Sequence, residues 1–146
     1  MTVRLADIRV TLDHGYGLAG GVNAVLTEVV GRLEQLAAGG APHTIDLRSL
    51  PLNPVERERL QALLGDGEVD VTLQLAGVSR VRETGASGVW WIEHRDLGGE
   101  LIAETLEIAS VPELLAADPE DLGRSADALR ARIRAATAAT TPENAP

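Results

Sequence analysis

Apolar residues recur along this chain with two periods, which separate the expected helices from the expected strands. A period of three to four residues predicts amphipathic helices over residues 22–37, 54–64 and from 119 onward. Gly39-Gly40 ends the first helix, and an N-cap at Asn53 begins the second. The apolar stripe of the third helix consists of Leu122, Ala126, Leu129 and Ile133. Each helix therefore has one face to bury.

Alternation of apolar and polar residues predicts short strands between these helices. The expected strands are residues 3–12, 44–47, 68–76, 80–84, 89–96 and 100–109. The last four are joined by links too short for crossover helices, such as Gly98-Gly99, so they must pair antiparallel. We therefore expect an α+β fold, with an antiparallel β-sheet of about four to six strands packed with three to four helices, mainly on one face. A single domain is expected over residues 1–136, followed by a disordered tail over 137–146.

Charge and cysteine content narrow the possible partners. Twenty-two acidic against 13 basic side chains give a net charge of -9, which repels nucleic acids and acidic membrane surfaces. The sequence has no apolar stretch long enough for a membrane span and no signal-peptide core, so we expect a cytoplasmic protein. The absence of cysteine excludes thiolate nucleophiles, disulfides and iron–sulfur clusters held by cysteine.

Three glycines near the start have the spacing of a dinucleotide-binding turn. Gly15, Gly17 and Gly20 form G-x-G-x-x-G, but residues 68–109 offer hairpins where a dinucleotide fold requires crossover helices. The acidic residue expected about 20 positions further on would be Asp46, which lies 26 residues after Gly20. We interpret the glycines as a flexible turn before the first helix and expect no cofactor. The alternative is a small cofactor-binding enzyme that uses the turn at residues 15–20.

Several short motifs in the middle of the chain share an order and spacing with one known family. The most specific are Ile45-Asp46-Leu47-Arg48 with Leu50-Pro51-Leu52, Leu64-Gly65-x-Gly67-Glu68-Val69, Arg82-Glu83-Thr84, and Gly88-Val89-Trp90 with His94. Over residues 21–115 the chain resembles the conserved region of the HupH/HyaF family of hydrogenase expression proteins. The resemblance carries more weight than the glycine pattern because several motifs agree at once.

The resemblance implies a role in assembly. It implies a cytosolic, chaperone-like accessory protein, not an enzyme, that helps to mature a nickel–iron uptake hydrogenase on or near its iron–sulfur small subunit. The implied partners are a hydrogenase precursor subunit and other maturation proteins. Family members can carry the conserved unit twice, whereas this chain carries it once, so a homodimer is a further hypothesis. A generic protein-interaction adaptor is the remaining alternative.

Few residues are candidates for a catalytic or metal-binding site. His94 lies near Glu93 and Asp96, but on a strand Glu93 points away from the other two, so the three cannot converge on one metal ion. No serine lies in a nucleophile-elbow context, and no carboxylate pair has a spacing that argues acid and base roles. We therefore expect neither a catalytic site nor a metal site.

The candidate interaction residues are Trp91, Arg48, Arg82, Glu83 and His94. Trp90 and Trp91 point to opposite faces of a strand, and Trp91 shares its face with Glu93 and Arg95. We therefore expect Trp90 in the core and Trp91 on a contact surface, unless a helix also covers Trp91. Arg48, Arg80 and Arg82 form either a basic patch or surface ion pairs with residues such as Glu83 and Asp46.

Overall fold

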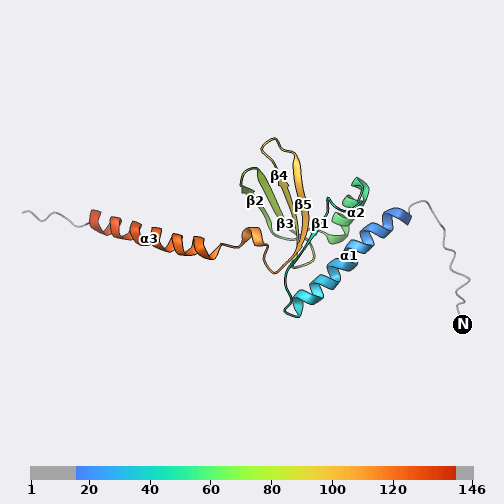
Figure 1. Cartoon of the computed structure of the whole chain (residues 1–146), viewed down its shortest axis with the longest axis horizontal. Coiled ribbons are helices and arrows are strands. Elements are labelled where there is room, and N and C mark those ends of the chain that lie inside the picture. Colours follow the sequence, from blue (N-terminus) through green and yellow to red (C-terminus); the bar gives the residue numbers. More distant parts are fainter. Residues whose placement is uncertain (1–15, 141–146) are drawn as a thin grey trace, which may run out of the picture. The chain divides into compact units, whose positions relative to one another are not determined.

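The computed structural model describes residues 16–140, and side chains are described from Gly20 onward. The chain divides after Pro112 into two compact units. Among the described residues, the larger unit contains two helices and five strands (Figure 1), and the smaller unit contains a short 3-10 helix, η2, and the last helix, α3. The elements in chain order are α1 (Tyr16–Ala37), β1 (His43–Asp46), α2 (Pro54–Leu64), β2 (Asp70–Gln74), β3 (Val78–Glu83), β4 (Val89–Arg95), β5 (Leu101–Ile108), η2 (Glu113–Leu115) and α3 (Pro119–Ala139).

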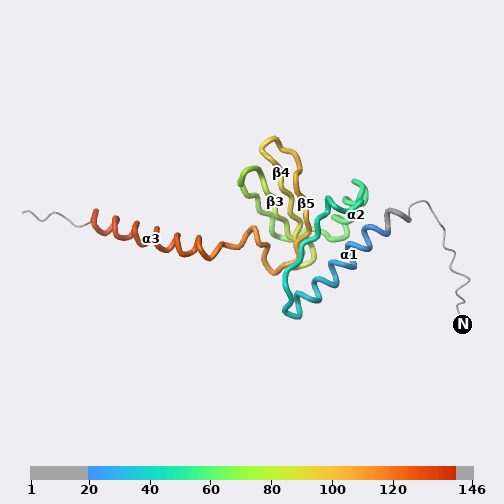
Figure 2. Tube along the Cα trace, viewed as in Figure 1, coloured from blue at the N-terminus to red at the C-terminus, as the bar shows by residue number. Residues whose placement is uncertain are grey.

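The five strands form one antiparallel sheet in the order β1-β5-β4-β3-β2, which confirms the expected α+β fold. Strands β2 to β5 form consecutive hairpins, as the short links require. Figure 2 shows that the β2–β3 and β4–β5 turns lie at the same end of the sheet. Strand β1 returns to pair with β5, with Ile45 opposite Leu106. Among the described residues, β1 and β2 are therefore the edge strands.

One face of the sheet packs against α1 and α2 and holds the main core (Figure 1). Val22, Val25 and Val29 from α1 meet Leu60 and Leu64 from α2. Across from them lie the sheet residues Ile45, Val89, Trp91, Leu106 and Ile108. Complete burial of a Leu or Val side chain stabilises the fold by about 1.5–3 kcal/mol, so this layer supplies most of the hydrophobic stabilisation of the larger unit.

The start of α2 is determined by its local sequence. The Asn53 side chain accepts a hydrogen bond from the backbone N–H of Glu56 at 2.9 Å, and the Glu56 carboxylate accepts one from the Asn53 N–H at 2.9 Å. Pro54 occupies the first turn, where no donor is needed. This reciprocal capping box confirms the predicted start and positions Leu60 and Leu64 over the sheet.

Other boundaries differ from the prediction. Helix α1 begins at Tyr16 instead of residue 22, so Gly17 and Gly20 lie inside the helix. Periodicity revealed α1 only from Val22 onward, because the first turns of the helix contain three glycines, which sequence rules assign to turns. Helix α3 continues to Ala139, so the first residues of the predicted tail are helical. The predicted strand over residues 3–12 lies outside the described residues.

Candidate interaction surface

Trp90 and Trp91 are both buried, which confirms the first expectation and corrects the second. Trp91 retains only 2% of its surface exposed and belongs to the core that α1 and α2 cover. Trp90 points to the opposite face and is 7% exposed, and its indole N–H donates to the Ala109 carbonyl at 2.9 Å. The prediction of an exposed Trp91 was wrong, because α1 and α2 pack against this residue. Burial decreases along β4 from Trp91 to its polar neighbours Glu93 and Arg95.

Trp91 is instead part of a buried polar cluster. Its indole N–H donates to Oε1 of Glu104 at 3.2 Å, and Oε2 of Glu104 forms an ion pair with Arg57 of α2. Arg57 also donates to the Leu47 carbonyl at 3.1 Å. Glu104 is 4% exposed, and a buried carboxylate requires such partners. The cluster therefore connects β4, β5, α2 and the end of β1.

Sequence reasoning missed Glu104, although a signal was present. Along β5, Glu104, Leu106 and Ile108 share one face by alternation. An acidic residue within such an apolar row predicts a buried charge that needs a partner. The partner Arg57 lies on a different element, so the sequence did not indicate which residue supplies it.

Arg82 and Glu83 lie together on β3 but point to opposite faces. Arg82 is level with Trp91, and its Nη1 lies 3.9 Å from Oδ1 of Asp66. Glu83 is level with Trp90 on the other face, and its backbone N–H donates to the Val69 carbonyl at 2.8 Å. Both side chains are half-buried, so neither offers a fully exposed surface.

The arginines do not form one basic patch. Arg80 makes two hydrogen bonds to the Asp70 carboxylate, at 3.0 and 2.5 Å, and Arg82 lies near Asp66. The hydrogen bonds from Arg80 lower the pKa of Asp70, and those same bonds raise the pKa of Arg80. Arg48 follows β1, at the opposite edge of the sheet from β2. The ion-pair alternative is therefore confirmed for Arg80 and Arg82, with partners other than those expected.

His94 binds a buried hydroxyl. Its Nδ1 lies 2.7 Å from Oγ of Ser79, the residue opposite it on β3. Ser79 is 3% exposed, so its hydroxyl is not presented to a substrate, and the imidazole satisfies a group that would otherwise be buried without a partner. No group of three or more His, Cys, Asp or Glu side chains within the described residues has an arrangement that could hold a metal ion.

Arg48 lines an open groove of about 460 Å³ along the outer edge of β5, which we call the edge groove. Its lining residues are Asp46, Arg48, Ser49, Ile102, Ala103 and Thr105. The groove exists because β1 ends at Asp46 while β5 begins at Leu101, so within the described chain the first residues of β5 have no neighbouring strand on that side. The Arg48 guanidinium covers part of this edge by donating to the Ile102 carbonyl.

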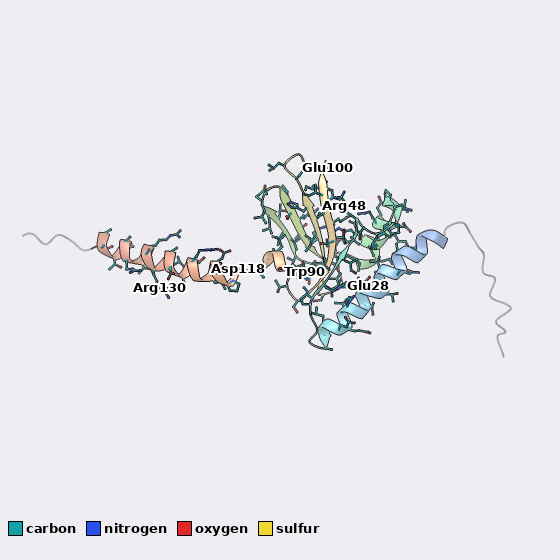
Figure 3. All side chains as sticks on the ribbon, in the orientation of Figure 1. Glu28, Arg48, Trp90, Glu100, Asp118 and Arg130 are labelled. Atoms are coloured by element: carbon teal, nitrogen blue, oxygen red, sulfur yellow. The ribbon has the colours of Figure 1, made fainter. Side chains whose placement is uncertain are left out.

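The edge groove combines apolar and polar contacts. Ile102 is 45% exposed, while the Asp46 carboxylate accepts a hydrogen bond from the backbone N–H of Arg48 at 2.9 Å. Figure 3 places Arg48 toward the same end of the sheet as Glu100, away from Trp90. His94 is opposite Ala103 in the β4–β5 pairing, so it lies on the same face beside the groove. Of the five predicted residues, only Arg48 lines the edge groove, and His94 lies one strand further in, opposite Ala103.

The chain is also similar to known proteins. The family model described as HupH hydrogenase expression protein, C-terminal conserved region, matches residues 20–136 of this chain. The chain is 34% identical over 122 residues to the hydrogenase expression/formation protein HupH of Rhizobium leguminosarum bv. viciae, and this match covers 82% of this chain and 43% of that protein. It is 38% identical over 89 residues to the hydrogenase-1 operon protein HyaF of Escherichia coli, with 60% of this chain and 31% of that protein covered.

A solved structure supports the same relationship. The hydrogenase expression protein HupH from Thiobacillus denitrificans matches with a TM-score of 0.74 and 41% identity, covering 79% of this chain and 96% of that chain. The match to the curated relatives spans less than half of their length. Sequence motifs, fold and coverage agree, and the chain therefore belongs to the HupH hydrogenase expression protein family, through its C-terminal conserved region.

Proposed function

We propose that this chain is a protein-binding accessory factor for the maturation of a nickel–iron uptake hydrogenase. Its relatives are named hydrogenase expression/formation proteins and a hydrogenase operon protein, which supports a role in making the enzyme. The proposed partner is the precursor of the iron–sulfur small subunit, together with other maturation proteins. In this role the chain holds or docks the apoprotein, because it has no cysteine with which to carry a cluster.

The edge groove is the proposed contact surface, and the observation that carries this assignment is that no described strand pairs with the outer side of β5 before Thr105. An extended polypeptide that displaces the Arg48 guanidinium from the Ile102 carbonyl can bind this edge through backbone hydrogen bonds and place an apolar side chain against Ile102. Arg48 and Asp46 border the same edge and can pair with charged groups of the bound chain. His94, beside Ala103, extends the surface onto the sheet.

A binding role fits the described side chains better than catalysis. The Ser79–His94 pair is the arrangement closest to a nucleophile and base, but the hydroxyl is buried. The alternative enzyme required a glycine turn between a strand and a helix at residues 15–20, and Gly17 and Gly20 instead lie within α1. Within residues 16–140, no helix combines the length and the apolar composition needed to cross a bilayer.

Co-purification tests the proposal. Tagged chain expressed with a hydrogenase operon should capture the small-subunit precursor, and should capture less of the mature subunit. Ile102→Asp and Arg48→Glu should each reduce capture, whereas Leu63→Asp on α2 should not, since Leu63 is 55% exposed and does not line the groove. If the precursor is not captured, or the groove variants capture it as well as the unchanged chain, the proposal is wrong.

A further inference from the structure

Within the described residues of the smaller unit, nothing buries the apolar stripe of helix α3. Leu122 is 58% exposed, Leu129 is 55% exposed and Ile133 is 65% exposed, and no residue of α3 is buried. The N-terminus of the helix is capped by Asp118, whose side chain accepts a hydrogen bond from the Glu120 N–H at 2.7 Å. Pro119 occupies the first turn. Most helices in proteins gain their stability by packing an apolar face.

The spacing of this stripe is that of a coiled-coil seam. Leu122, Ala126, Leu129 and Ile133 are separated by four, three and four residues, the alternation of the a and d positions of a heptad. Ala136 continues the pattern. A seam of this kind fits a second helix better than it fits a sheet, because side chains at a and d insert between those of a parallel or antiparallel neighbour.

The charges of α3 are divided between its two halves. Asp118, Glu120, Asp121 and Asp127 lie in the first half with one arginine, Arg124. The second half contains Arg130, Arg132 and Arg134 and no carboxylate up to Thr140. Ion pairs within the helix, such as Arg124 with Asp121 and Arg130 with Asp127, neutralise only part of this separation. One end of α3 is therefore acidic and the other basic.

We infer that α3 is a self-association surface and that its partner is the α3 helix of a second copy, in antiparallel orientation. This orientation places the acidic half of each helix beside the basic half of the other and also opposes the two helix dipoles. In this orientation Leu122 packs against Ile133 of the second copy, and Ala126 packs against Leu129 of the second copy. Each small side chain of the seam therefore meets a large one. A parallel pair would bring like charges together and leave Ala126 facing Ala126. The inference does not depend on the proposed function.

Sedimentation equilibrium of the full chain tests the association. The unchanged chain should form a concentration-dependent dimer that weakens at high salt, because the pairing charges are exposed and screened. Leu129→Ser should raise the dimer dissociation constant at least about tenfold, since two leucines leave the seam of each dimer. Leu97→Ser is the matched control, because Leu97 is 89% exposed in the other unit, and it should leave the constant unchanged.

Spin labels test the orientation, and the lack of cysteine makes single-site labelling direct. Labels at Ala128→Cys should lie close together in the dimer, while labels at Ala138→Cys should be separated by about 32 Å along the helix axis. Short separations at both positions would contradict the antiparallel arrangement. A chain that stays monomeric, a dimer that Leu129→Ser leaves intact, or a stripe that is needed only for binding the precursor would each overturn the inference. None of these results alters the edge-groove test.

Discussion

The indole N–H of Trp91 donates to the Glu104 carboxylate beneath α2, at 3.2 Å, and Glu104 in turn pairs with Arg57. Loss of the carboxylate leaves a half-buried guanidinium and a buried indole N–H without their shared acceptor. We predict that Glu104→Ala lowers the free energy of unfolding by about 2–4 kcal/mol. Urea denaturation followed by tryptophan fluorescence measures this loss.

The exposed Glu100→Ala is the control for that variant and should change stability by less than about 0.5 kcal/mol. A double-mutant cycle with Arg57→Met isolates the interaction, because removing both charges should cost less than the sum of the single losses. Additive losses would contradict the coupled cluster.

Local signals predicted the parts of this fold that neighbouring residues determine. The capping box of α2 and the hairpins from β2 to β5 follow from residues a few positions apart, and they were predicted. The burial of Trp91 and the pairing of Glu104 with Arg57 depend on where α2 lies over the sheet. The edge groove depends on the unequal lengths of β1 and β5. Alternation within one strand contains none of this information. Trp91 was therefore predicted to be exposed, whereas it is buried.

The same burial makes a prediction for fluorescence. In Trp90→Phe, the remaining Trp91 should emit at short wavelength and be weakly quenched by acrylamide, because it is 2% exposed. Strong quenching in the folded variant would contradict its place in the core. Guanidinium-unfolded protein supplies the fully quenched reference.

Gly77 should be intolerant of any side chain. Its φ is +131°, and a Cβ atom there would lie 2.2 Å from the Arg95 carbonyl oxygen at the neighbouring hairpin. We predict that Gly77→Ala costs at least about 2 kcal/mol, from backbone strain together with the displaced turn.

Gly99→Ala separates these two causes. Gly99 also has a positive φ, +85°, but its Cβ would meet no atom within 4 Å. In Gly99→Ala only backbone strain contributes, so thermal unfolding should show a decrease of about 1 kcal/mol in the free energy of unfolding. Equal losses in the two variants would show that the close approach to Arg95 has no effect.

The Asp70–Arg80 pair gives stability a defined pH dependence. Arg80 lowers the pKa of Asp70 below its ordinary value of 3.8 in the folded chain. The contribution of the pair is therefore complete above the unfolded pKa and is lost as the pH falls through the lowered folded pKa. Asp70→Asn should have a lower melting temperature than the unchanged chain at about pH 6, and the difference should vanish near about pH 2. A difference that stays constant with pH would contradict the pair.

Titration calorimetry of the purified small-subunit precursor into this chain tests the central proposal most directly. The unchanged chain should bind, and Ile102→Asp should weaken binding at least about tenfold because it places an unpaired charge against the apolar part of the edge groove. Leu63→Asp should bind like the unchanged chain, and unfolding curves should show both variants folded. An unchanged affinity in Ile102→Asp, or the absence of any binding by the unchanged chain, would contradict the account.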